Sequence, residues 1–178
     1  MRYGYIDLNN FKEEELDNPK LLLEKSYKEL QSLTLPQISA RAKSQSLSVS
    51  YKGISKEGVI HFQCSSGTHP GKFYNQYIKL LDLPFLLKDR KDYKDRDLVN
   101  LAVFGDIAVY CDDPSFKYYG WQYLSGINGY GLKREVRYPS MKNPYLKGSI
   151  CKHLFAVFNA FPMYINSFVK DFRKVKIL

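Results

Sequence analysis

Two short pairs of metal-ligating residue types constrain this chain more than any other feature of its sequence. Cys111 and Asp113 follow a run that alternates as a β-strand does, and Cys151 and His153 stand in the first turn of a helix predicted over residues 149–158. Thiolate, imidazole and carboxylate groups are the ligands that zinc binds in proteins. The loop between the two pairs does not prevent their approach, because the entropy of loop closure grows slowly with length. We therefore expect the end of a strand and the start of a helix to meet around one zinc ion.

Two other interpretations of the same residues stay open. Cys111, Cys151 and His153 could pack as a metal-free polar cluster in the core. Asp112, Asp113 and His153 could instead serve a hydrolase or nuclease, although the pattern offers no second carboxylate half-site. The sequence contains no phosphate-binding glycine loop and no Ser/His/Asp arrangement that can be placed. These features favour a protein that is not an enzyme.

A period of two in the apolar residues predicts an antiparallel β-meander before the ligand pairs. Glycine-containing turns separate three alternating runs, which cover residues 47–51, 58–64 and 72–80. The alternation puts Ile60, Phe62 and Cys64 on one face of the second run. Cys64 is therefore expected to be a core thiol.

Helical periodicity is clearest near the N-terminus. Asn18 is the expected cap and Pro19 the first helical position, and apolar residues then recur at spacings of three and four as far as Leu33. This predicted helix either packs on its own domain or docks on a neighbouring subunit. A mixed-charge run over residues 88–97 favours an exposed loop.

These patterns together predict an α+β fold with an N-terminal helix, a small antiparallel β-sheet and a strand–loop–helix unit. The expected organisation is an N-terminal helix and extended arm at residues 1–46, a compact domain at 47–160 and a basic C-terminal tail at 161–178. The strand–loop–helix unit at 106–158 lies within the compact domain. Ser149 is the expected N-cap of its helix.

The charge balance indicates acidic or polyanionic partners. The net charge is +9, and the chain contains 15 Tyr against one Trp. Basic and aromatic residues occur together in the Gly-rich stretch after the predicted strand, at Tyr130, Lys133, Arg134, Arg137 and Tyr138. In a nucleic-acid-binding protein this cluster would contact phosphate and stack on bases. In a structural protein it would instead be an interface loop.

Other features of the sequence indicate the cellular compartment in which the protein works. Three cysteines, an odd number spread along the chain, favour a reducing environment over a secreted disulfide framework. The first residues do not show a signal-peptide pattern, and no apolar run approaches the roughly 20 residues that span a bilayer. We expect a soluble protein without membrane contact.

The ligand pairs resemble the SWIM-type zinc motif, Cys-x-Cys followed after a spacer by Cys-x-His. Residues 106–116 followed by 143–154 are more closely similar to a variant found in proteins of tailed bacteriophages. That variant has a strand ending in Cys-x-Cys-Pro-x-Phe, an aromatic loop, and then Asn-Pro-x-x-x-Gly-x-x-Cys-Lys-His-Leu. The resemblance covers roughly residues 47–160.

The resemblance assigns ligand positions one by one. Cys111 matches the first ligand, Cys151 the third and His153 the fourth, while Asp113 stands where the second Cys is expected. A zinc site of two thiolates, one imidazole and one carboxylate would be less closed and weaker than the usual set. The other implication of this departure is a vestigial site without metal.

The resemblance implies a non-enzymatic structural or assembly protein of a tailed-phage virion, in the head–tail connector, neck or tail ring. Its partners would be other virion proteins and copies of itself in a symmetric ring, with packaged DNA nearby. It would be assembled in the host cytoplasm and stay in the virion. The alternative function is a zinc-knuckle-like nucleic-acid-binding module.

Overall fold

The computed structural model describes residue 30, residues 45–88 and residues 90–175. The predicted N-terminal helix and arm therefore lie outside the described residues, except for Leu30 and the last two positions of the arm. Leu30 is helical and completely buried in the core, and its carbonyl oxygen accepts a hydrogen bond of 2.8 Å from the Ser149 hydroxyl. At this one residue the chain packs on its own domain.

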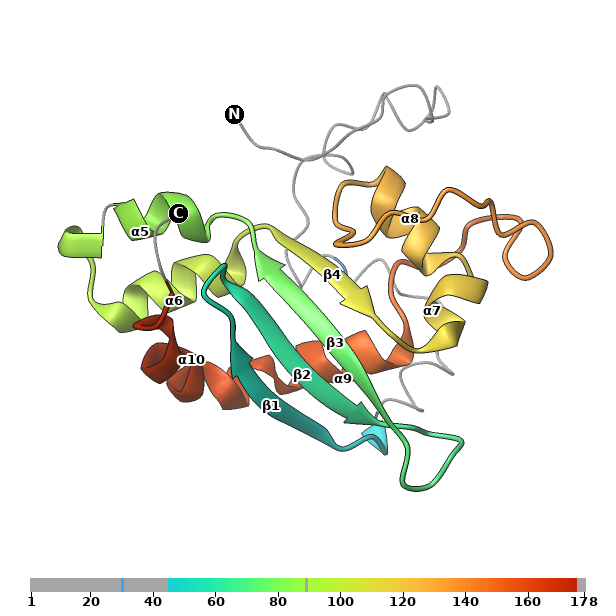
Figure 1. Cartoon of the computed structure of the whole chain (residues 1–178), viewed down its shortest axis with the longest axis horizontal. Coiled ribbons are helices and arrows are strands. Elements are labelled where there is room, and N and C mark those ends of the chain that lie inside the picture. Colours follow the sequence, from blue (N-terminus) through green and yellow to red (C-terminus); the bar gives the residue numbers. More distant parts are fainter. Residues whose placement is uncertain (1–29, 31–44, 89, 176–178) are drawn as a thin grey trace.

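Four antiparallel strands form one sheet in the order β1-β2-β3-β4, as Figure 1 shows. The strands are β1 (Val49–Ile54), β2 (Val59–Ser65), β3 (Phe73–Leu80) and β4 (Ile107–Cys111). The predicted α+β class and antiparallel meander are thus confirmed, and the strand that carries Cys111 extends the meander as its fourth member.

The two faces of the sheet differ in burial. Ile60, Phe62 and Cys64 of β2 are completely buried, whereas the residues between them are only half-buried. This confirms that Cys64 is a core thiol. The alternation is interrupted in β1, where the register shifts between Tyr51 and Gly53.

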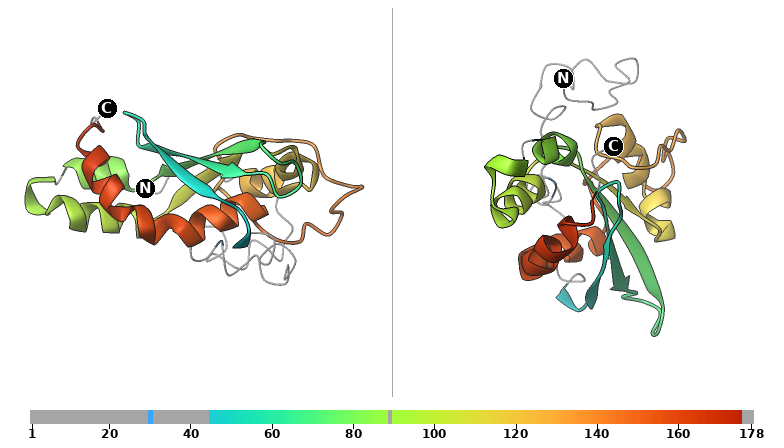
Figure 2. Two further views of the ribbon diagram at one scale, coloured as in Figure 1. Left: turned by 90° about the horizontal axis from the view of Figure 1, so that it is seen from below. Right: turned by 60° about the vertical axis from the view of Figure 1, so that its left-hand side comes forward.

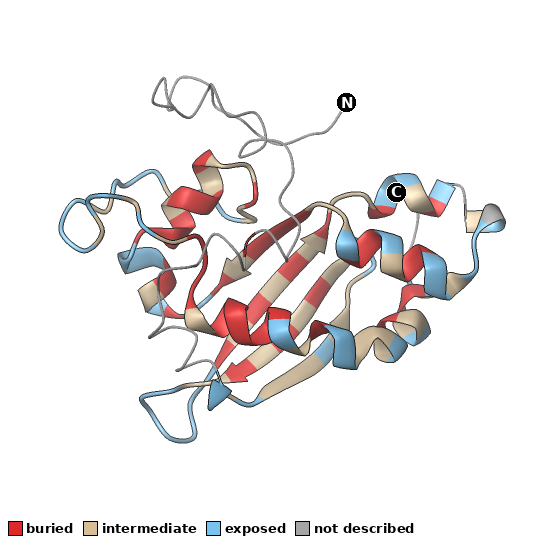
Figure 3. Ribbon diagram, turned by 180° about the vertical axis from the view of Figure 1, so that it is seen from behind, coloured by how far each residue is buried: buried red, intermediate tan, exposed pale blue. Residues whose placement is uncertain are grey.

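Helices cover the buried face and both ends of the sheet. They are α5 (Leu83–Lys88), α6 (Asp95–Phe104), α7 (Pro114–Tyr118), α8 (Trp121–Ile127), α9 (Lys152–Ala160) and α10 (Ile165–Phe172), with 3₁₀ turns η2 (Arg90–Asp92) and η3 (Phe161–Tyr164). Figures 2 and 3 show α9 and α10 as a layer against one face, with the strands behind it. None of the helices in the described part of the chain has the length and apolar character needed to cross a bilayer.

Residues 161–175 pack on the core, which corrects the predicted basic tail at residues 161–178 as far as that segment is described. Phe161, Phe168 and Phe172 are buried in the same core as the sheet. The ring of Phe168 lies 5.2 Å from that of Tyr51 and 6.0 Å from that of Phe62, measured between centroids. The basic residues that suggested a tail lie on the exposed side of α10 and just after it, while residues spaced by four face inward.

Three local expectations were also wrong. The mixed-charge run is partly helical, because α6 begins at Asp95, whose carboxylate pairs with Arg90 at 3.3 Å and with Arg173 at 2.9 Å. The Gly-rich aromatic stretch contains two short helices, α7 and α8. Ser149 does not cap α9: that position is taken by Cys151.

Candidate metal centre

Cys111, Cys151 and His153 converge in the structure, as the sequence predicted. All three are buried, and their ligand atoms lie within 4.8 Å of one another. A tetrahedral zinc ion with bonds of about 2.3 Å to sulfur and about 2.1 Å to nitrogen holds its ligand atoms about 3.5–3.8 Å apart. A movement of about 1 Å or less would therefore bring the three atoms to bonding distance.

The end of β4 places Cys111 in the candidate metal centre. Ile107, Val109 and Cys111 alternate toward the core, so the thiol follows the inward face of the strand. Asp112 points the other way, and its two carboxylate oxygens accept hydrogen bonds of 2.7 Å from the backbone and side-chain nitrogens of Asn75. The predicted grouping of Asp112 with Asp113 and His153 for hydrolysis is therefore not supported, because both Asp112 oxygens are engaged by Asn75.

The start of α9 supplies the other two ligand atoms. Cys151 is the N-cap residue, and its carbonyl accepts the helical hydrogen bond from Phe155 at 3.0 Å. Ser149, two residues before Cys151, accepts a 3.0 Å hydrogen bond at its carbonyl from the Tyr130 hydroxyl. This bond, together with the one from Ser149 to Leu30, fixes where the helix begins.

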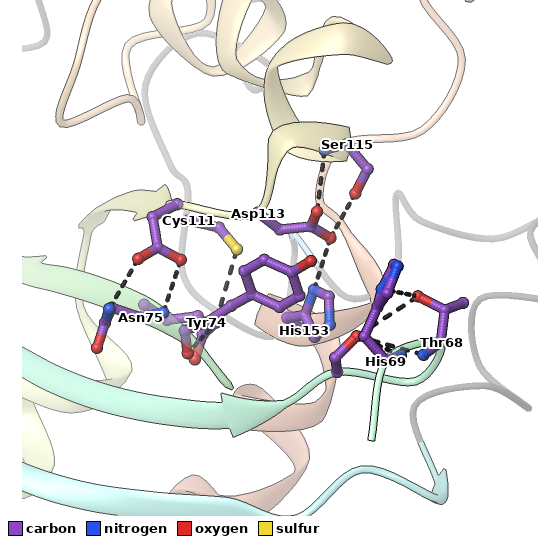
Figure 4. A network of polar contacts seen from close by, with 11 residues as sticks. Thr68, His69, Tyr74, Asn75, Cys111, Asp113, Ser115 and His153 are labelled. Atoms are coloured by element: carbon purple, nitrogen blue, oxygen red, sulfur yellow. Dashed lines mark hydrogen bonds and ion pairs between the residues drawn. The ribbon is translucent and has the colours of Figure 1, made fainter. Parts of the chain in front are cut away.

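Asp113 lies against His153 instead of within the group of three. Its Oδ2 is 3.0 Å from Nδ1 of His153, and Figure 4 shows the carboxylate directed toward the ring. Asp113 also caps α7, accepting a hydrogen bond of 3.0 Å from the backbone N–H of Ser115. Burial alone would raise the pKa of Asp113, but His153 and Ser115 outweigh it and lower this pKa to about 2. The carboxylate is thus ionised and beside the imidazole.

His153 is completely buried, yet neither of its ring nitrogens has an aligned hydrogen-bond partner among the described residues. The Asp113 oxygen is close enough to Nδ1 for an ion pair, but the contact does not have hydrogen-bond geometry. Burial disfavours the charged ring, but Asp113 and Cys111 together outweigh it, so the pKa of His153 is raised. A buried polar group without an aligned partner is costly, and a metal ion would satisfy it.

The metal-free Cys111 thiol is not suited to nucleophilic chemistry. Burial, and after it the neighbouring Cys151 thiol, raise the pKa of Cys111 well above its usual value. A protonated, buried thiol is inert, whereas zinc deprotonates the thiols that bind it. The donor set therefore fits a metal ion better than it fits a catalytic cysteine.

Gln76 is a contributor that our sequence analysis missed. Its side chain is completely buried, and its amide nitrogen donates to Sγ of Cys111 at 3.6 Å and to the Tyr74 carbonyl at 3.0 Å. Such N–H donors around a ligand sulfur tune metal sites. The sequence did indicate a buried polar side chain here, because Gln76 occupies an inward position of β3 between Tyr74 and Ile78.

The basic and aromatic cluster is only partly available for contacts. Tyr130 is 2% exposed, so the predicted stacking of this ring on a base or a partner is wrong. Arg137 is exposed and forms a two-point ion pair with Glu135 through bonds of 3.1 and 3.2 Å. Tyr138 is exposed and donates to the Pro144 carbonyl, and Lys133 and Arg134 are exposed as well.

Comparison of the chain with known protein families, curated proteins and solved structures found no match.

Proposed function

We propose that Cys111, Cys151 and His153 hold a structural zinc ion that fastens the end of β4 to the start of α9. The observation that carries this proposal is the mutual approach of the three ligand atoms within 4.8 Å in a buried site. Burial favours a structural role over a catalytic one, because catalytic zinc keeps a position open to substrate. Asp113, which stands at the second ligand position of the motif, either completes the shell or holds the imidazole as carboxylates do in many zinc sites.

For the protein as a whole, we infer a non-enzymatic structural or assembly role in a tailed-phage virion, in the head–tail connector, neck or tail ring. The support is the convergence of three motif positions that the resemblance depends on. The net charge of +9 agrees with a place near packaged DNA. The partners are other virion proteins and copies of this chain.

The loop between α8 and α9 supports the assembly role. Three of its apolar side chains are strongly exposed, at 71% for Val136, 91% for Met141 and 80% for Tyr145. The loop is also ordered by its own contacts, since the Asn143 side chain bonds to both the N–H and the carbonyl of Lys147 at 2.8 and 2.9 Å. Exposed apolar residues on a preorganised loop are typical of protein interfaces.

The alternative, in which this loop is a zinc-knuckle-like nucleic-acid-binding module, has weaker support. Tyr130 is buried and Arg137 is already paired with Glu135. We therefore assign the loop to protein contacts.

Native mass spectrometry of the full chain tests the assembly role. We expect a ring-sized oligomer, and we expect the double variant Met141→Ser, Tyr145→Ser to shift it toward monomer, because each change removes exposed apolar area from the contact. Met163→Ser is the matched control, because Met163 is also 80% exposed but lies in η3. A chain that stays monomeric at all concentrations and is absent from purified particles would overturn this role.

A further inference from the structure

The face of the sheet opposite the metal centre carries a row of stacked rings. His61, Tyr77 and Tyr110 are directly opposite one another on β2, β3 and β4. The His61 and Tyr77 rings are stacked with centroids 4.8 Å apart and planes 10° apart, and Tyr77 and Tyr110 follow at 6.3 Å and 26°. The Lys133 ammonium closes the row, 4.2 Å above the Tyr110 ring.

The row stops at a glycine. The partner of His61 on β1 is Gly53, at the register shift, and a Cβ atom built there would meet nothing within 4 Å. Cross-strand rings stacked at about the strand spacing of 4.8 Å stand upright on the sheet, with their faces toward neighbouring strands. One face of the imidazole is therefore directed toward Gly53, where no side chain stands on the neighbouring strand.

The imidazole is held in place for such a contact. Its Nε2 lies 2.9 Å from Oδ1 of Asn75, and Asn75 is in turn fixed by two hydrogen bonds of 2.7 Å to Asp112. A ring that is already oriented loses little entropy when a ligand stacks on it.

The surroundings of the row are basic and open. Lys52 is exposed next to Gly53, Lys79 follows Tyr77 on the same face of β3, and Lys133 lies at the far end. Asp112 is acidic, but both of its oxygens accept hydrogen bonds from Asn75. In Figure 1 no described helix lies over this face of β1, β2 and β3.

We propose that this face binds single-stranded nucleic acid, with one base stacked on His61 above Gly53 and the phosphates near the lysines. Stacking needs an unpaired base with an accessible face, which a duplex does not offer, and every base has such a face. The site lies on the face of the sheet opposite the zinc centre, and its central residues, His61 and Gly53, belong neither to that centre nor to the exposed apolar positions of the assembly loop.

Fluorescence anisotropy with a labelled thymidine oligonucleotide of about 12 nucleotides tests this site on the full chain. We expect His61→Ala to weaken binding about tenfold, and His61→Phe to stay within about twofold of the wild type because it keeps a stacking ring. Tyr93→Ala is the matched control, since Tyr93 is an exposed ring beside η2, and it should bind as the wild type does. Affinity should fall with added salt.

Backbone amide NMR shifts locate the contact without relying on a variant that must fold. The oligonucleotide should shift Gly53, His61 and Tyr77 and leave the loop around Met141 unchanged. The proposal is overturned if the wild type does not bind at low salt, or if the shifts map to that loop. It is equally overturned if a duplex of the same length binds as well, or if His61→Ala binds as tightly as the wild type.

Discussion

Cys151→Ala should remove the zinc ion from the protein and, with it, all of the stability that zinc supplies. With free zinc at about a thousand times its dissociation constant, mass action adds about 4 kcal/mol to the free energy of unfolding. The wild type should lose this amount when a chelator is added, and Cys151→Ala should be insensitive to the chelator. Urea unfolding with and without chelator measures both quantities.

Cys64→Ala is the matched control for that experiment. Cys64 is as fully buried as Cys151, but its sulfur is not part of the group of three ligand atoms. Burial, with a smaller effect of Cys111, raises the pKa of Cys64 to about 12, as expected for a core thiol. Cys64→Ala should lose packing energy yet keep the full chelator effect. Equal chelator effects in Cys151→Ala and the wild type would contradict the assignment of Cys151 as a ligand.

Phe168→Ala should lower the free energy of unfolding by about 3–5 kcal/mol, the usual cost of deleting a buried phenylalanine ring. Phe168 is completely buried, and its ring contacts Tyr51 of β1, Phe62 of β2 and Phe161 of η3. The loss would show that α10 is an integral part of the domain.

Met163→Ala serves as the control for that substitution, because Met163 is exposed and its loss should change stability by less than about 0.5 kcal/mol. Two-state chemical unfolding of both variants gives the comparison. If Phe168→Ala were as stable as the wild type, α10 would be an appended segment, as the sequence had suggested.

The sheet was predictable because its signal is local. The period of two in β2 and β3 assigns each residue to a face, and the structure keeps that assignment. The meeting of Cys111 with Cys151 and His153 was predictable from ligand chemistry and from the motif resemblance.

What the sequence did not predict depends on tertiary contacts. The aromatic residues of α10 face the core only because β1 and β2 present Tyr51 and Phe62 to them. Tyr130 can be buried because its hydroxyl donates a hydrogen bond to the Ser149 carbonyl, 19 positions later in the chain. Gln76 was overlooked although a polar residue at an inward strand position indicates a buried polar site.

The position of Asp113 shows the limit of reading ligands from spacing alone. The motif placed it at a ligand position, and the structure places its carboxylate 3.0 Å from His153, where it also caps the start of α7. One carboxylate can cap a helix and contact the imidazole at the same time. The spacing of residues in the sequence does not distinguish these two roles from direct binding of the metal.

X-ray absorption at the zinc edge, on full-length protein purified without added metal, shows whether zinc is bound and which atoms bind it. We expect one zinc ion per chain, with two sulfur atoms at about 2.3 Å and a histidine nitrogen at about 2.0–2.1 Å. Purified protein that contains no zinc, or zinc whose ligand shell contains no sulfur, would contradict the proposed site.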